Sequence, residues 1–159
     1  PQNVRKHFSY VLVLHASDLP NGKGWSPHVW EIIGGAEQIT VSLLEASSEI
    51  DSGRIWKKEI VLIDKTYLWH EINDLLFRVE LSLVTYAIDN YSTVVPSLQE
   101  NSECSSTYER RRPEDSELNV TKSLAEQFDL LRVCDTKRFP AFFYFHGKKF
   151  LLKIEKSDD

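Results

Sequence analysis

An apolar run near the start of the chain, ending in a histidine, most constrains the fold. Residues 10–14 read Tyr-Val-Leu-Val-Leu, and His15 follows them directly. A continuous apolar run, here over residues 8–14, is typical of a β-strand covered on both faces. A carboxylate, Asp51, comes 36 positions after the histidine in a turn. A buried strand that delivers a histidine to a loop, with an aspartate returning from a later loop, is how an α/β enzyme places a proton-handling pair.

The remaining hydrophobic pattern predicts further strands and helices. Alternating apolar residues predict strands at 38–44 and 55–63. Apolar residues at helical spacing predict a short helix at 27–34 and a long one at 65–90. Residues 92–118 are polar and irregular, and so long a loop in a compact domain is usually functional or disordered.

The last quarter of the chain predicts a second unit of structure. We expect a helix over 122–134, because Ser123 and Glu126 have capping-box spacing. Its buried stripe would consist of Leu124, Phe128 and Leu131. A hairpin follows, with strands at 141–145 and 150–154 and a turn at 146–148. The chain is therefore expected to be α/β, with a small C-terminal α+β segment ending in a β-hairpin.

Charge and composition exclude several functional classes. The 159 residues carry a net charge of −5 with an isoelectric point near 5.6, which disfavours a general nucleic-acid binder. We expect a cytoplasmic protein without membrane contact, because no signal peptide is visible and no apolar stretch approaches the ~20 residues of a membrane span. Cys104 and Cys134 are expected to be free thiols. We expect no metal, because His28, His70 and His146 lack ligand spacing.

His15 and Asp51 each have a structural and a chemical interpretation. A lone histidine at a strand end is often a satisfied core residue, and Asp51-Ser52-Gly53 in isolation is a common turn. As a pair, they gain a role. A neutral imidazole takes a proton from an attacking amine or donates to an oxyanion, and the carboxylate orients the ring.

Arginines and tryptophans are the other candidate binding residues. Residues 110–112 are three consecutive arginines in an otherwise acidic chain, suited either to gripping a phosphate or diphosphate or to a solvated loop. Trp25 and Trp30 are suited to stacking on a pterin or base, although a tryptophan is more often a core residue.

These motifs together resemble a known enzyme family. The string His15-x-Ser17-x-Leu19-Pro20, the following glycine-rich loop with Trp25-Ser26-Pro27, and Asp51-Ser52-Gly53 resemble the catalytic half of folate-dependent formyltransferases. Gln99, residues 111–116 and residues 138–142 resemble the substrate-side segment of the sugar-nucleotide formyltransferases. The resemblance covers roughly residues 8–155.

The resemblance implies a fold and a division of the chain. The fold would be the second half of a formyltransferase-like, Rossmann-type sheet, with an N-terminal part missing. Residues 1–92 would be the catalytic α/β region, 93–118 a substrate-side loop, and 119–159 the C-terminal helix and hairpin.

It also implies a reaction, in which a formyl group moves from N10-formyltetrahydrofolate to a primary amine. His15 and Asp51 match the catalytic pair. Residues implied to bind substrate or cofactor are Ser17, Leu19, Gly24, Trp25, Gln99, Arg111 and Arg112. An amino sugar on a nucleotide is the favoured acceptor, because tRNA requires a phosphate-binding surface that this acidic chain lacks. The resemblance also allows a homodimer.

One departure from the family pattern keeps alternatives open. The family has an asparagine two positions before the histidine, where this chain has Val13, which cannot donate a hydrogen bond. Either a protonated His15 and backbone groups then serve the oxyanion, or activity is reduced. The alternatives are a methionyl-tRNA formyltransferase-like enzyme, a formyl-folate hydrolase, and a degenerate ligand-binding module without catalysis.

Overall fold

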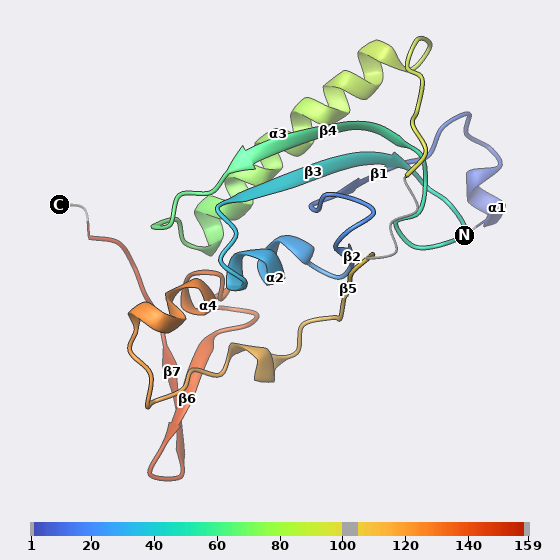
Figure 1. Ribbon diagram of the computed structural model, residues 1–159. Coiled ribbons are helices and arrows are strands. Elements are labelled where there is room, and N and C mark those ends of the chain that lie inside the picture. Colours follow the sequence, from blue (N-terminus) through green and yellow to red (C-terminus); the bar gives the residue numbers. More distant parts are fainter. Residues whose placement is uncertain (1, 100–104, 158–159) are drawn as a thin grey trace.

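A three-stranded antiparallel sheet with one long helix on it forms the centre of the molecule. The structure is a computed structural model that describes residues 2–99 and 105–157 (Figure 1). Strands β1 (Leu12–His15), β3 (Gln38–Glu45) and β4 (Ile55–Leu62) lie in the order β1-β3-β4. Helix α3 (Trp69–Asn90) runs along one face. The core residues between them are Ile39, Val41, Leu43, Trp56, Val61, Ile72, Leu76 and Leu83. The predicted α/β class is confirmed, with strands β3 and β4 at the expected positions.

Two short helices and a short pair of strands accompany the sheet. Helix α1 spans Gln2–Arg5 and helix α2 spans Pro27–Ile33. The two-residue strand β2 (Lys23–Gly24) pairs in parallel with β5 (Thr107–Tyr108). This pairing places the segment after residue 105 beside the loop that follows His15, although the two are far apart in the sequence.

The C-terminal part builds its own small core. Two 3₁₀ turns (Pro113–Ser116 and Ala125–Gln127) and helix α4 (Phe128–Arg132) precede the hairpin. Its strands are β6 (Ala141–Phe145) and β7 (Lys148–Leu152), joined at His146-Gly147, where both residues have positive φ. The hairpin is confirmed, with its second strand beginning two residues earlier than predicted. Buried between α4 and the hairpin are Leu118, Leu131, Cys134 and Ala141.

A buried arginine attaches this C-terminal part to the sheet domain. Arg132 is 1% exposed and donates from Nε to Asp129 at 2.6 Å. Its Nη1 donates to the carbonyl oxygens of Asp64 and Tyr67, just before α3. These bonds hold α4 against the start of α3, where one wall of the candidate site forms.

The first strand is shorter and more exposed than its sequence indicates. It covers only Leu12–His15, and Val13 is 37% exposed, whereas Phe8 and Tyr10 lie outside it and are also exposed. Within the described residues, β1 pairs with β3 alone, so it is an edge strand of this sheet. The prediction of a strand buried on both faces is therefore wrong for this structure.

Helices α3 and α4 are both shorter than the helices predicted at 65–90 and 122–134. The segment before Trp69 forms a turn instead, because Thr66 donates from its backbone and hydroxyl groups to the Asp64 carboxylate. The predicted 122–134 helix is reduced to a 3₁₀ turn and α4, because Gln127 folds back onto Asn119. The Ser123–Glu126 capping box is present, but Leu124 is 61% exposed and not part of a buried stripe.

Two further observations concern the described residues only. No helix there is long and apolar enough to cross a membrane. No group of three or more His, Cys, Asp or Glu side chains is arranged to hold a metal ion. Cys134 is a buried free thiol, and Cys104 lies outside the described residues.

Candidate active site

His15 ends strand β1 and is held between two acceptors. Its side chain is 8% exposed, and its Nε2 lies 2.9 Å from the carbonyl oxygen of Gly22. Its Nδ1 lies 3.6 Å from Oδ2 of Asp51. A carbonyl oxygen can only accept, so Nε2 carries a proton. The other ring nitrogen, Nδ1, is directed at the Asp51 carboxylate, so the two loops fix the orientation of the imidazole.

The Asp51 turn is built to hold its carboxylate in place. Asp51 has a φ of 52°, and a side chain at Gly53 would overlap the Glu45 carbonyl oxygen, so this turn needs glycine. Gln99 donates from Nε2 to the carbonyl oxygens of Asp51 and Gly53, both at 2.8 Å. The predicted binding residue Gln99 therefore supports the turn.

Gly24 joins the two loops of the site. Its backbone N–H donates to Oδ2 of Asp51 at 3.0 Å, the same oxygen that faces His15. Its φ is 97°, and a Cβ there would lie 2.3 Å from the Tyr108 carbonyl oxygen. Only glycine permits this approach, so Gly24 acts through its backbone.

Two predicted binding residues lie beneath the loop. Ser17 is fully buried and donates to the Asn21 carbonyl oxygen at 2.9 Å. Leu19 is 1% exposed and packs with Leu44 and Ile55. Neither side chain is exposed to a ligand in this structure, so both shape the loop that carries Gly22 and Gly24.

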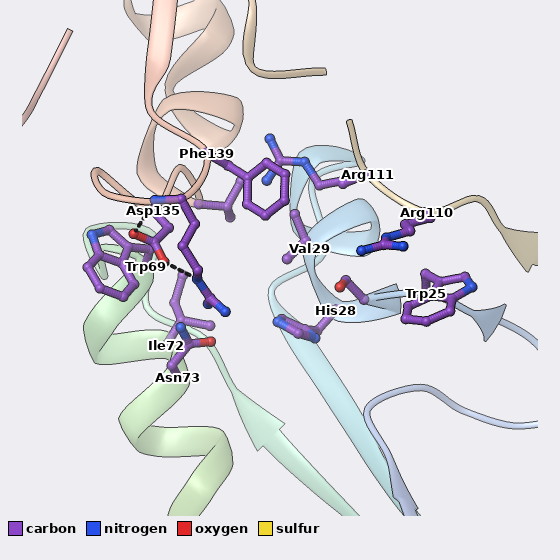
Figure 2. Close-up of a pocket in the computed structure, with 13 residues that line it drawn as sticks. Trp25, His28, Val29, Trp69, Ile72, Asn73, Arg110, Arg111, Asp135 and Phe139 are labelled. Atoms are coloured by element: carbon purple, nitrogen blue, oxygen red, sulfur yellow. Dashed lines mark hydrogen bonds and ion pairs between the residues drawn. The ribbon is translucent and has the colours of Figure 1, made fainter. Parts of the chain in front are cut away.

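A polar cavity beside the site opens between α2, the start of α3 and residues 133–139 (Figure 2). Its volume is about 330 Å³. It is lined by Trp25, Ser26, His28, Val29, Trp69, Ile72, Asn73, Arg110, Arg111, Val133, Asp135, Arg138 and Phe139. The loop from Gly24 to Trp25 links it to the His15–Asp51 pair, and we call it the arginine cavity.

Trp25 and Arg111, two of the predicted binding residues, line this cavity, whereas Arg112 lines a neighbouring one. Trp25 is 57% exposed, so the alternative that it is a core residue is wrong, and Arg110 lies 5.2 Å from its ring. Trp30 instead stacks on Tyr108. The Arg112 side chain is exposed, and its backbone N–H donates to Asp115.

A second, smaller cavity is lined in part by Asp51. Its volume is about 230 Å³, and Val13 contributes to it from the same face of β1 as His15. The other residues that line it are Arg5, Leu44 and residues 45–51. The Asp51 turn therefore borders this cavity, which we call the turn cavity. Val13 presents an apolar side chain to it and offers no hydrogen-bond donor.

Burial sets the charge of two groups on helix α2. Burial, with a smaller contribution from the nearby His15, lowers the pKa of His28 to about 4. Burial, with a smaller contribution from the Asp18 charge, raises the pKa of Glu31 to about 7. His28 is therefore neutral at pH 7, and Glu31 titrates near it.

Sequence reasoning missed part of the arginine cavity. It considered His28 only as a metal ligand, and did not place Trp69, Asn73 or Asp135 at a site. The i, i+3 spacing of His28 and Glu31 on a short helix was the available signal, because polar residues on the inner side of a helix are costly to bury. No local signal connects residues 69–73 with 133–139.

Known proteins with similar sequences are formyltransferases. No protein-family model matches the chain. The methionyl-tRNA formyltransferase of Lachnospira eligens is 32% identical over 149 residues, which cover 91% of this chain and 45% of that protein. The enzyme of the same name from Rickettsia bellii is 28% identical over 115 residues, covering 72% and 38%. The chain thus spans less than half the length of these relatives.

Solved structures show the same fold. Methionyl-tRNA formyltransferase from Clostridium thermocellum superposes with a TM-score of 0.73 at 24% identity, covering 95% of this chain and 70% of that one. A 4-N formyltransferase from Francisella tularensis gives 0.74 at 22% identity, covering 94% and 64%. HypX from Aquifex aeolicus in complex with tetrahydrofolic acid gives 0.73 at 21% identity, covering 96% and 26%. The resemblance to folate-dependent formyltransferases is confirmed, and the fold is that of formyltransferases.

Proposed function

We propose that this chain carries the catalytic centre of an N-formyltransferase. The formyl group would come from N10-formyltetrahydrofolate and pass to a primary amine, and the favoured acceptor is an amino sugar on a nucleotide. One observation carries the proposal. In a chain with the formyltransferase fold, a buried histidine lies 3.6 Å from a carboxylate, at a turn that borders one cavity and beside a loop that leads to another.

The His15–Asp51 pair supplies the proton handling that this reaction needs. An amine attacks only when it is unprotonated, so a group that takes a proton near neutral pH is required. We assign this role to His15, whose Nδ1 lies 3.6 Å from the Asp51 carboxylate. The Gly24 N–H donates to Asp51 and keeps the carboxylate oriented toward the ring.

The turn cavity fits the head group of a folate. Its volume of about 230 Å³ is below the usual range for a whole drug-sized ligand, so it suits part of that molecule. The loop of residues 47–51 borders the cavity, and Val13 offers an apolar surface. When bound there, the folate supplies the formyl group. The oxyanion would be stabilised by backbone N–H groups and by the charge of a protonated His15, because Val13 has no donor and both His15 nitrogens face protein acceptors.

The charge of the chain supports a small acceptor over a macromolecular one. The net charge is −5, and Arg110, Arg111 and Arg138 line a cavity of about 330 Å³, a size typical of small-molecule sites. The second candidate acceptor is methionyl-tRNA, because proteins with similar sequences are methionyl-tRNA formyltransferases. The buried free thiol of Cys134 accords with a cytoplasmic enzyme.

The test is formyl transfer by the chain with nucleotide-linked amino sugars, followed by mass spectrometry. The wild type is expected to formylate the sugar amine, and His15→Gln to lose at least 100-fold of that rate, the lower range for losing a general acid–base. His7→Gln, which changes an exposed histidine, is the matched control. Wild-type rates in His15→Gln would refute the role of His15.

The same assay separates the alternatives. Formylated methionyl-tRNA without formylated sugar identifies the second acceptor. Free formate released without any acceptor identifies a hydrolase. Folate binding without turnover of any kind identifies a binding module.

A further inference from the structure

His28 is a polar side chain of the arginine cavity to which the proposed function gives no role. It lies in the first turn of helix α2, and Figure 2 shows its ring at the cavity, between Trp25 and Asn73. Its Nδ1 is buried and has no hydrogen-bond partner among the described residues. Unpaired buried polar groups are costly and rare, so the ring calls for a functional explanation.

The ring of His28 is neutral at pH 7, and its proton belongs on Nε2. Burial, with a smaller contribution from the charge of His15, lowers the pKa of His28 to about 4. A neutral imidazole has one N–H and one acceptor nitrogen. A buried N–H without an acceptor is rarer than a buried acceptor without a donor, so the unpaired Nδ1 is the acceptor and Nε2 carries the proton.

His28 also lies near the His15–Asp51 pair. The charge of His15 contributes to the lowered pKa of His28, so the two rings are close enough to interact electrostatically. The residues just before α2 reach Asp51 as well, because the Gly24 N–H donates to its carboxylate. The ring therefore belongs to the part of the arginine cavity that adjoins the catalytic pair, where the amine and the formyl group would meet.

The proposed transfer places negative charge on the formyl oxygen. As the amine nitrogen bonds to the formyl carbon, the π electrons of the carbonyl move to its oxygen, and a proton passes from the amine to His15. When the bond between that carbon and the donor nitrogen breaks, the electrons return to the carbonyl, and the proton passes from His15 to the donor nitrogen. A side-chain N–H aimed at this oxygen stabilises the charge while it lasts.

The side chains nearest to this chemistry have no N–H to spare for that oxygen. Val13 stands where the formyltransferase pattern has an asparagine, and it has no donor. The two nitrogens of His15 face the Gly22 carbonyl oxygen and the Asp51 carboxylate. A further side-chain donor has to come from another element.

The buried arginine of the cavity is held on a different wall. Arg111 is 9% exposed, and its Nη2 donates to Ser116 Oγ at 2.9 Å and to the Asp115 carbonyl oxygen at 3.3 Å, both neutral acceptors. Arg138 pairs with Asp135 at 2.7 Å. These bonds tie both guanidinium groups to the C-terminal part, whereas His28 comes from α2, which follows the Gly24 loop directly.

We propose that His28 is a catalytic residue that donates from Nε2 to the formyl oxygen, in place of the asparagine that position 13 lacks. A neutral imidazole suits this task, because it can polarise a carbonyl as a hydrogen-bond donor without itself being charged. The assignment rests on the proposed function, since it requires a formyl group beside His15.

The first test compares His28→Leu with His28→Gln in formyl transfer to nucleotide-linked amino sugars. His28→Leu should lower kcat about 100- to 1000-fold, the usual loss for one oxyanion donor, and leave KM for the amine within about threefold. His28→Gln should stay within about tenfold of the wild type, because the glutamine amide also carries an N–H. His7→Leu, at an exposed position, is the matched control and should keep the wild-type rate.

A second substitution separates an oxyanion donor from a merely structural histidine. Val13 is 37% exposed, so an asparagine is tolerated there. In the His28→Leu background, Val13→Asn should recover about tenfold or more of the lost kcat, because it returns a donor to the oxygen. A loss of packing at position 28 would not be repaired by an amide on β1.

NMR spectroscopy of the histidine rings tests the assignment without turnover. At pH 7, His28 in the full wild-type chain should be neutral, with its proton on Nε2. Addition of 10-formyl-5,8-dideazafolate, a stable analogue of the formyl donor, should shift the Nε2 resonance of His28 and leave that of His7 unchanged.

Several outcomes overturn the proposal. A folded His28→Leu with the wild-type kcat does so, as do equal losses in the leucine and glutamine variants, or a proton on Nδ1. If His28→Leu does not fold, an unshifted Nε2 resonance overturns it. Transfer by the wild type with an unaffected His28→Leu refutes His28 alone, whereas no transfer by the wild type to any amine refutes the proposed function and this role with it.

Discussion

Replacing Gly24 by alanine should separate the two loops that form the candidate active site. The residue combines a positive φ of 97° with a close approach, since a Cβ there would lie 2.3 Å from the Tyr108 carbonyl oxygen. The positive φ costs about 1–2 kcal/mol for a residue with a Cβ. The clash requires β2 to move away from β5.

That movement threatens two hydrogen bonds, whose loss sets the size of the effect. The Trp25 N–H donates to the Tyr108 carbonyl oxygen at 3.1 Å, a bond worth about 1 kcal/mol. The Gly24 N–H donates to the Asp51 carboxylate at 3.0 Å, a charged bond worth about 1.5–3 kcal/mol. Because these contributions are not additive, we expect Gly24→Ala to lower the free energy of unfolding by about 3–5 kcal/mol.

The measurement is urea unfolding followed by tryptophan fluorescence, with Gly35→Ala as the matched control. Gly35 has a φ of 89°, but a Cβ there meets nothing within 4 Å, so its substitution costs only the backbone strain. Gly24→Ala should therefore be less stable than Gly35→Ala by at least about 2 kcal/mol, the contribution of the lost hydrogen bonds. Equal losses in the two variants would refute the close packing of β2 against β5.

Three further substitutions test the site. Asp51→Asn should slow the proposed transfer about 30- to 1000-fold in single-turnover kinetics. The reason is that, at 3.6 Å, the attraction of the carboxylate for a protonated His15 is at most about 4–5 kcal/mol. A rate within threefold of the wild type would argue against a charged partner for His15. In urea unfolding, Glu31→Gln should become more stable relative to the wild type as the pH rises from about 4.5 to 8. The pKa of Glu31 is raised to about 7 in the folded wild type, so the folded wild type holds a proton that it loses in this range. A pH-independent difference between the two proteins would contradict the burial of Glu31. The wild type should lose stability as the pH falls from 6.5 to 4, and His28→Leu should lose less. The pKa of His28 is lowered to about 4 in the folded protein, so the unfolded chain takes up the histidine proton first as the pH falls. An unchanged acid profile in the variant would show that His28 is accessible to water.

Much of the local structure could be predicted from the sequence. Strands β3 and β4, helix α2 and the C-terminal hairpin lie where periodicity and turn residues place them, because apolar alternation, Pro27 and the His146-Gly147 turn act over a few residues. The ends of α3 and α4 could not be predicted so well. There, side chains such as Thr66 and Gln127 bond to the backbone and compete with the helix.

The candidate catalytic pair was also predictable from the sequence. For some of the residues around it, the role observed in the structure differs from the predicted one. A histidine at a strand end and a carboxylate in a glycine turn are local patterns, and the structure brings their side chains together. Ser17 and Leu19 belong to the same motif, yet both are buried below the loop. A motif records which residues occur together and not which of them face a ligand.

The sequence alone determined the elements, the His15–Asp51 candidates and the arginine run. Only the tertiary structure decided which arginines face a cavity and which polar groups lack partners. The arginine cavity combines residues near positions 25, 70, 110 and 135, which meet through the two-residue β2–β5 pairing and the buried Arg132. Contacts between distant segments leave no periodic signal in a single sequence, and burial, which fixes the charge of His28 and isolates that of Arg111, exists only after those segments have packed.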